Sequence, residues 1–136
     1  MSFDLNKDNF STAAEQGVEL ELILPTGAGS GAYLTIIGDN SKTVKAYSRK
    51  KFQEYQMKVQ IAKRKGKEPE ELSLEEAEEL AVESAAVRVM GWKGFTEDGK
   101  EVKFSKEKLN EVLSVHQWIR EFVMQESSNI FHFVPK

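Results

Sequence analysis

The sequence predicts a mostly helical α+β fold, with an N-terminal β-hairpin or small antiparallel sheet packed against about four helices. Two strand-like stretches lie before residue 38, on either side of a glycine-rich loop. The rest of the chain holds longer stretches in which apolar residues recur at steps of three and four. Since the chain has 136 residues, we expect a single domain, residues 1–136, with a buried core.

The predicted hairpin consists of residues 18–24 and 33–37. In the first strand, apolar residues alternate with mostly acidic ones, which is typical of a strand with one solvated face. The loop between the strands carries Gly27, Gly29 and Gly31. A phosphate-binding loop opens a helix and carries a Lys-Ser or Lys-Thr pair, whereas this loop opens a strand and has no such pair. We therefore expect a flexible hairpin loop.

The first long helix is predicted over residues 41–65, where nothing breaks a helix and Asp39, Asn40 or Ser41 can serve as N-cap. Its expected apolar stripe consists of Val44, Tyr47, Lys51 or Phe52, Tyr55, Val59 and Ala62. Residues 66–69 connect it to a second helix, which we expect to pack antiparallel to the first.

The second helix is predicted over residues 74–90. Ser73 and Glu76 have the spacing of a capping box at its start, and Gly91 is suited to end it. Trp92 and Phe95 follow at once, and we interpret these two rings as a packing corner rather than a ligand cage. Burial of one such ring contributes roughly 1.5–3 kcal/mol.

A polar turn at residues 97–99 leads to a further helix that begins at Ser105. Leu109, Val112 and Leu113 form its apolar face. A second apolar series over residues 115–123 either continues this helix or follows a bend near Ser114.

Both ends of the chain differ in character from its middle. Residues 1–16 are polar with few apolar side chains, so we expect a flexible arm. The C-terminal tail, residues 127–136, is unusually apolar for a terminus. It either docks on the body or binds a partner, for which Ile130, Phe131 and Phe133 are the candidate anchors.

The charges of the two long helices are segregated. Residues 41–67 contain ten basic residues and one acidic residue, whereas residues 68–83 contain eight glutamates and no basic residue. We expect the helices to lie side by side and to neutralise each other. The alternative is that Lys63, Arg64, Lys65 and Lys67 meet an acidic partner or nucleic acid.

Composition and motifs give no sign of catalysis or of a cofactor. The chain has no cysteine and only two histidines, which do not have the spacing of zinc ligands. No local motif places a nucleophile beside a base. The sequence also has no signal peptide and no apolar run of ~18 residues. We therefore expect a cytoplasmic protein that is not an enzyme and holds neither a cofactor nor a metal.

The order of these parts resembles the tail assembly chaperones of bacteriophages or prophages with long, non-contractile tails, the siphophage type. The resemblance covers roughly residues 18–123. It is carried by the hairpin, the charged helical pair and several short motifs. These motifs are residues 38–41 (Gly-Asp-Asn-Ser), 91–95 (Gly-Trp-Lys-Gly-Phe), Gly99, 102–104 (Val-Lys-Phe), Ser105, Leu109 and Leu113.

The resemblance implies a non-enzymatic protein of the bacterial host cytoplasm that is absent from the mature virion. Such chaperones hold the tape measure protein soluble and recruit tail tube protein during tail morphogenesis. Many are made in two lengths by programmed ribosomal frameshifting. We expect the same partners here, with the charged faces available for self-association and with no membrane or nucleic-acid partner.

Two other function classes stay open. A small nucleic-acid-binding protein would use the basic helix and would bind in a salt-sensitive way. A structural tail or head completion protein would be found in purified particles.

Overall fold

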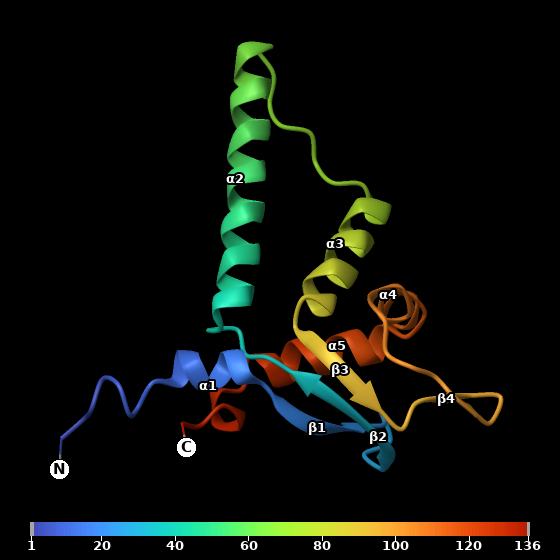
Figure 1. Ribbon diagram of the computed structural model, residues 1–136. Coiled ribbons are helices and arrows are strands. Elements are labelled where there is room, and N and C mark those ends of the chain that lie inside the picture. Colours follow the sequence, from blue (N-terminus) through green and yellow to red (C-terminus); the bar gives the residue numbers. More distant parts are fainter. Residues whose placement is uncertain (1, 136) are drawn as a thin grey trace.

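The structure is a computed structural model that describes residues 2–135, and it confirms the mostly helical α+β fold. Figure 1 shows a small sheet at the base of the molecule and one long helix that projects from it. The elements, in chain order, are α1 (Phe10–Gln16), β1 (Val18–Ile23), β2 (Gly29–Ile36), α2 (Lys42–Arg64), α3 (Leu74–Ala86), β3 (Val89–Lys93), β4 (Thr96–Glu97), β5 (Lys100–Glu101), α4 (Lys106–Val115), α5 (Gln117–Ser127) and the 3-10 turn η1 (Ile130–His132).

The main sheet is antiparallel, in the order β1-β2-β3. The predicted hairpin is confirmed as β1 and β2, although β2 begins at Gly29 rather than at residue 33. The third strand was not predicted, and it corrects the expected end of the second helix. The predicted second helix ends at Ala86 instead of residue 90, and Gly91 lies within β3 opposite Thr35. Val89 is fully buried opposite Ile36, so pairing with the hairpin replaces the last helical turn.

The hydrophobic core lies between this sheet and helices α3, α4 and α5, which pack against one another. The predicted helix from Ser105 divides into α4 and α5 at His116, close to the expected bend. Its buried side chains include Leu109, Leu113 and Val123. The core therefore combines the hairpin with α3, α4 and α5.

The prediction of a flexible arm is wrong for residues 10–16, because these residues form α1. The Asn9 side chain accepts a hydrogen bond from the Thr12 N–H and so caps this helix. Ala14 is fully buried, and its carbonyl accepts a hydrogen bond from the Gly38 N–H at 3.0 Å. A Cβ on Gly38 would lie only 2.8 Å from the Ala14 Cβ. The small residues Ala14 and Gly38 thus let α1 pack closely against the chain that follows β2. The few apolar residues of α1 did not indicate this packing.

The expected side-by-side packing of the two charged helices is also wrong. Helix α2 has nearly the predicted bounds, and Ser41 caps it by accepting a hydrogen bond from the Val44 N–H. Of its residues, all of which the structure describes, only Val44 is buried. The predicted stripe residues Phe52 and Tyr55 are 60% and 58% exposed. Figure 1 shows α2 and the shorter α3 diverging as they leave the body. An irregular segment, residues 67–73, joins the two helices.

Candidate partner-binding surfaces

The C-terminal turn, residues 129–134, presents apolar side chains to solvent. Ile130 and Phe131 are 49% and 85% exposed, whereas Phe133 is only 1% exposed. Phe133 belongs to the protein's own core, so the expectation that it anchors a partner is wrong. Ile130 and Phe131 are accessible, and both remain candidates. Of the two alternatives, docking on the body holds for Phe133, whereas Ile130 and Phe131 face outward and partner binding stays a prediction for them.

Hydrogen bonds hold this turn in place. The Asn129 side chain accepts a hydrogen bond from the Phe131 N–H at 3.1 Å, and the His132 ring pairs with the Glu126 carboxylate. Just before the turn, the buried Ser127 hydroxyl donates to the carbonyl of Ile37 at 2.8 Å. The exposed side chains consequently start from a defined backbone, which reduces the entropy that a partner must remove on binding.

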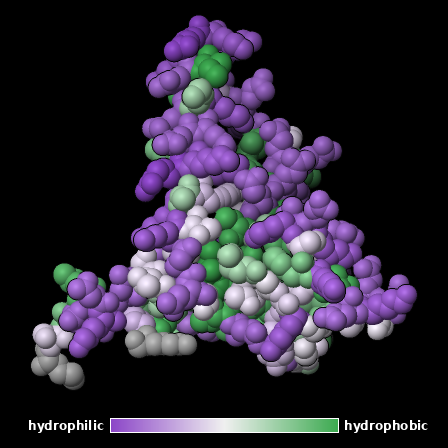
Figure 2. Space-filling model, in the orientation of Figure 1, coloured by the Kyte–Doolittle hydropathy of each residue, from purple (hydrophilic) through white to green (hydrophobic). Residues whose placement is uncertain are grey.

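Within residues 2–135, most basic side chains of α2 have no ion-pair partner. Lys63, Arg64 and Lys65 stand exposed at its far end. Among the residues that the structure describes, Lys51 is the only basic residue of α2 within ion-pair distance of a carboxylate. Figure 2 shows the projecting part of the molecule as mostly hydrophilic, with separate hydrophobic residues between the charged ones.

A groove of about 710 Å³ lies between α2, the connecting segment and α3, and we call it the acidic groove. Seven glutamates and two lysines line it, together with apolar side chains that include Tyr55, Leu72 and Leu80. Leu72 is 48% exposed. The charges that were expected to meet across two packed helices are thus held apart by an open, partly apolar space.

One ion pair closes the base of the acidic groove. The Lys51 Nζ atom lies 2.6 Å from Glu83 Oε1 and 3.3 Å from Glu54 Oε2. The hydrogen bond from Lys51 holds the pKa of the Glu83 carboxyl below its usual value. The same hydrogen bond raises the pKa of Lys51. Both groups are partly exposed, so this pair positions α2 relative to α3 more than it stabilises the fold.

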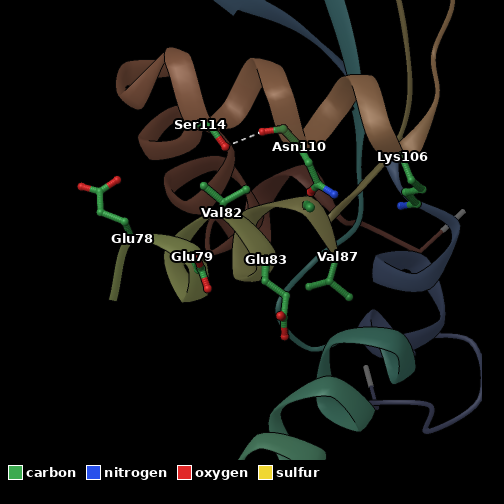
Figure 3. Close-up of a pocket in the computed structure, with 9 residues that line it drawn as sticks. Glu78, Glu79, Val82, Glu83, Val87, Lys106, Asn110 and Ser114 are labelled. Atoms are coloured by element: carbon green, nitrogen blue, oxygen red, sulfur yellow. Dashed lines mark hydrogen bonds between the residues drawn. The ribbon is translucent and has the colours of Figure 1, made fainter. Parts of the chain in front are cut away.

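A second, shallower pocket of about 560 Å³ lies between α3 and α4. Figure 3 shows Glu79 and Val82 of α3 on one side and Asn110 and Ser114 of α4 on the other. The Ser114 hydroxyl donates to the backbone carbonyl of Asn110 at 2.7 Å. The Lys106 ammonium donates to the Val89 carbonyl at 3.0 Å. These groups satisfy the backbone, and the pocket brings no base to the serine.

Residues 2–135 include no group of three or more His, Asp or Glu side chains arranged to hold a metal ion. Over the same range, no helix has the length and apolarity needed to cross a membrane.

Comparison with known protein families gives one result. A family model described as YdaY prophage protein matches residues 40–136. The chain belongs to this family. It is therefore a phage- or prophage-derived protein. No curated protein and no solved structure matches the chain.

The part of the chain matched by the YdaY family begins just before α2 and includes both candidate surfaces. It contains the acidic groove and the C-terminal turn, while α1 and the hairpin precede it. The YdaY segment also contains Trp92 and Phe95, the predicted packing corner, whose ring centroids lie 4.6 Å apart. Phe104 joins them edge-on at 5.1 Å from Trp92, and the Trp92 Nε1–H donates to the Val102 carbonyl.

Sequence reasoning identified Ile130 and Phe131 but missed the acidic groove. Its two walls were visible as charge runs, yet their separation depends on how α2 leaves the body. The one available signal was the weak apolar stripe of α2, in which Lys51 occupies a position that a packed helix would fill with an apolar residue.

Proposed function

We propose that this YdaY-family protein is a non-enzymatic tail assembly chaperone. It holds the tape measure protein soluble and recruits tail tube protein during tail morphogenesis in the host cytoplasm, and it is absent from the mature virion. Membership in a prophage family and the resemblance of residues 18–123 to siphophage chaperones both favour this role.

The observation that carries the proposal is the C-terminal turn, in which buried Phe133 holds exposed Ile130 and Phe131 in position. A chaperone for a long partner needs accessible apolar anchors on a surface that stays soluble. A few buried apolar residues usually supply most of the energy of an interface. Phe131, with 85% of its surface exposed, has the most to bury on contact.

The test is coexpression with the tape measure protein encoded by the same prophage. Deleting the whole tail would also remove the core residue Phe133, so point substitutions are preferable. The wild-type protein should keep the tape measure protein in the soluble fraction and copurify with it. The double variant Ile130→Ser/Phe131→Ser should fold normally and lose both effects.

The matched control is Val115→Ser, which removes a 71% exposed apolar side chain from the end of α4. This variant should behave like the wild type. If the double variant still solubilises the tape measure protein, the C-terminal turn is not the anchor. If the wild-type protein itself neither binds nor solubilises the tape measure protein, the chaperone function is wrong.

A second candidate is nucleic-acid binding by the exposed, unpaired side chains of Lys63, Arg64 and Lys65. The glutamates of the connecting segment, which line the space beside Lys65, work against it by repelling phosphates. Binding of DNA or RNA that falls steeply with salt, and that is lost in a Lys63→Glu/Arg64→Glu/Lys65→Glu variant, would favour this candidate. Recovery of the protein in purified phage particles would instead favour a structural tail or head completion protein.

A further inference from the structure

We propose that α2 of one molecule docks in the acidic groove of a second copy of this chain. The inference concerns the protein by itself and does not rest on the chaperone function. It starts from α2, a 23-residue helix with one buried side chain. Most of this helix lacks the tertiary packing that normally stabilises helices in proteins. Phe52, Tyr55 and Met57 are each about 60% exposed along it.

The two sides of α2 carry different residues. Lys51, Tyr55 and Lys58 line the acidic groove of their own molecule. At 3.6 residues per turn, Arg49, Phe52 and Lys63 lie on the side turned away from that groove. None of these three has an ion-pair or aromatic partner among the described residues. This outer side is therefore a basic surface with one large apolar side chain near its middle.

The acidic groove has the complementary chemistry. Its seven glutamates are opposed by only two lysines, so the groove carries an excess of negative charge. Tyr55, Leu72 and Leu80 offer apolar contacts among them. A basic helix with a central aromatic ring satisfies both features, and the outer side of α2 is such a helix. Opposite potentials on two surfaces of one chain favour association and fix its orientation.

The charge distribution favours a second copy over the same copy. Within one molecule, Lys51 and Glu83 already set the position of α2, and its outer side faces away from its own groove. The donor and acceptor surfaces are therefore different parts of the chain, so the contact is heterologous. However many molecules join through this contact, the open assembly keeps one free helix side at one end and one free groove at the other. Such contacts either close into a ring or continue as a chain.

The proposed contact leaves the C-terminal turn free. Figure 1 shows the C-terminal turn, in red, at the base of the molecule, near α1 and far from the tip of α2. Molecules joined through α2 could therefore each present Ile130 and Phe131 to a shared long partner.

The test uses the purified full-length protein in analytical ultracentrifugation or light-scattering chromatography over micromolar concentrations, after nuclease treatment. The wild-type protein should associate at low ionic strength and dissociate as salt is added, because screening weakens exposed charge pairs. Two variants separate the surfaces. Arg49→Glu/Lys63→Glu alters only the helix side, and Glu71→Lys/Glu79→Lys alters only the groove. Each should weaken association at least about tenfold, a change of about 1.4 kcal/mol.

Mixing the two variants gives the decisive result. The groove variant keeps an intact helix side and the helix variant keeps an intact groove, while their two reversed surfaces are also complementary to each other. An equimolar mixture should therefore associate with the two variants in equal amounts. Combining all four substitutions in one chain should restore association. Lys100→Glu/Lys103→Glu, which reverses two exposed charges elsewhere, is the matched control and should associate like the wild type.

Three outcomes would overturn the proposal. The wild-type protein could stay monomeric at low salt. Its association could vanish on nuclease treatment, which would make nucleic acid the link. The mixture of variants could also fail to associate although each variant folds, as judged by circular dichroism. The solubility test with the tape measure protein is a separate measurement, so failure of one proposal is distinguishable from failure of the other.

Discussion

The Arg88 Nε–H donates a hydrogen bond to Asp39 Oδ1 at 3.0 Å and so joins the end of α3 to the start of α2. Arg88 Nη1 also donates to the carbonyl and the hydroxyl of Ser84. The Ser127 hydroxyl lies 2.9 Å from the same Asp39 oxygen. Three elements far apart in the sequence therefore meet at one carboxylate, and this cluster sets the direction in which α2 leaves the body.

We expect Arg88→Met to lower the free energy of unfolding by about 1–3 kcal/mol, because it leaves Asp39 and the Ser84 carbonyl without their donor. Urea denaturation measures the change. The control is Lys93→Met, which removes an exposed ion pair with Glu19 and should cost about 0–1 kcal/mol. Equal effects of the two substitutions would mean that the Asp39 cluster has no special structural role.

The same cluster shows why part of the fold was predictable and part was not. The hairpin, the Ser41 and Ser73 caps and the bend before α5 follow from local patterns, and the structure has all of them. Strand β3 depends instead on pairing with β2, more than fifty residues away, which local propensity cannot reveal. Arg88 looked like one more position on a helical stripe, although it lies two residues beyond the end of α3 and binds Asp39.

The candidate surfaces divide in a similar way. An apolar run near the terminus was enough to single out Ile130 and Phe131. It could not separate them from Phe133, because burial depends on the space that α1 and Gly38 leave for that ring. The charge runs were equally plain. Opposite charges in adjacent helices do not reveal whether they pair within one molecule or between two, since both arrangements neutralise them.

A second prediction concerns pH. The Glu15 carboxylate accepts hydrogen bonds from the hydroxyl and the backbone N–H of Thr43, at 2.5 and 3.0 Å, and these hydrogen bonds lower the pKa of Glu15. A lowered pKa stabilises the fold above the pKa of the unfolded chain, and the stabilisation is lost as pH falls through the folded pKa. Glu15→Gln should therefore be less stable than the wild type at neutral pH.

This difference should begin to shrink as pH falls below about 4, and it should be lost below the lowered folded pKa, where the wild-type carboxyl is protonated in both states. Thermal unfolding of both proteins between pH 3 and 7 measures it. Asp8→Asn serves as the control for loss of an acidic charge nearby. A stability difference between Glu15→Gln and the wild type that does not change with pH would show that Glu15 acts through packing and not through its charge.

A third prediction concerns the aromatic corner of Trp92 and Phe95. Trp92→Ala should lower the free energy of unfolding by about 3 kcal/mol, at the low end for such substitutions because the ring is only partly buried. Trp92→Phe keeps most of the ring contacts but loses the hydrogen bond to the Val102 carbonyl. It should therefore lower the free energy of unfolding by only about 1 kcal/mol. An unchanged melting curve for Trp92→Ala, together with weaker binding of the tape measure protein, would instead place Trp92 in an interface.

The last prediction separates the two roles assigned to neighbouring residues of the C-terminal turn. Phe133→Ala should lower the free energy of unfolding by about 3–5 kcal/mol, because it leaves a cavity where the ring contacts Gly38 beside α1. Phe131→Ala should change stability by less than about 0.5 kcal/mol, since its ring is exposed. Chemical denaturation of both variants measures this contrast. Comparable losses would mean that Phe131 also belongs to the folded body, and the anchor for the tape measure protein would then have to lie elsewhere on the chain.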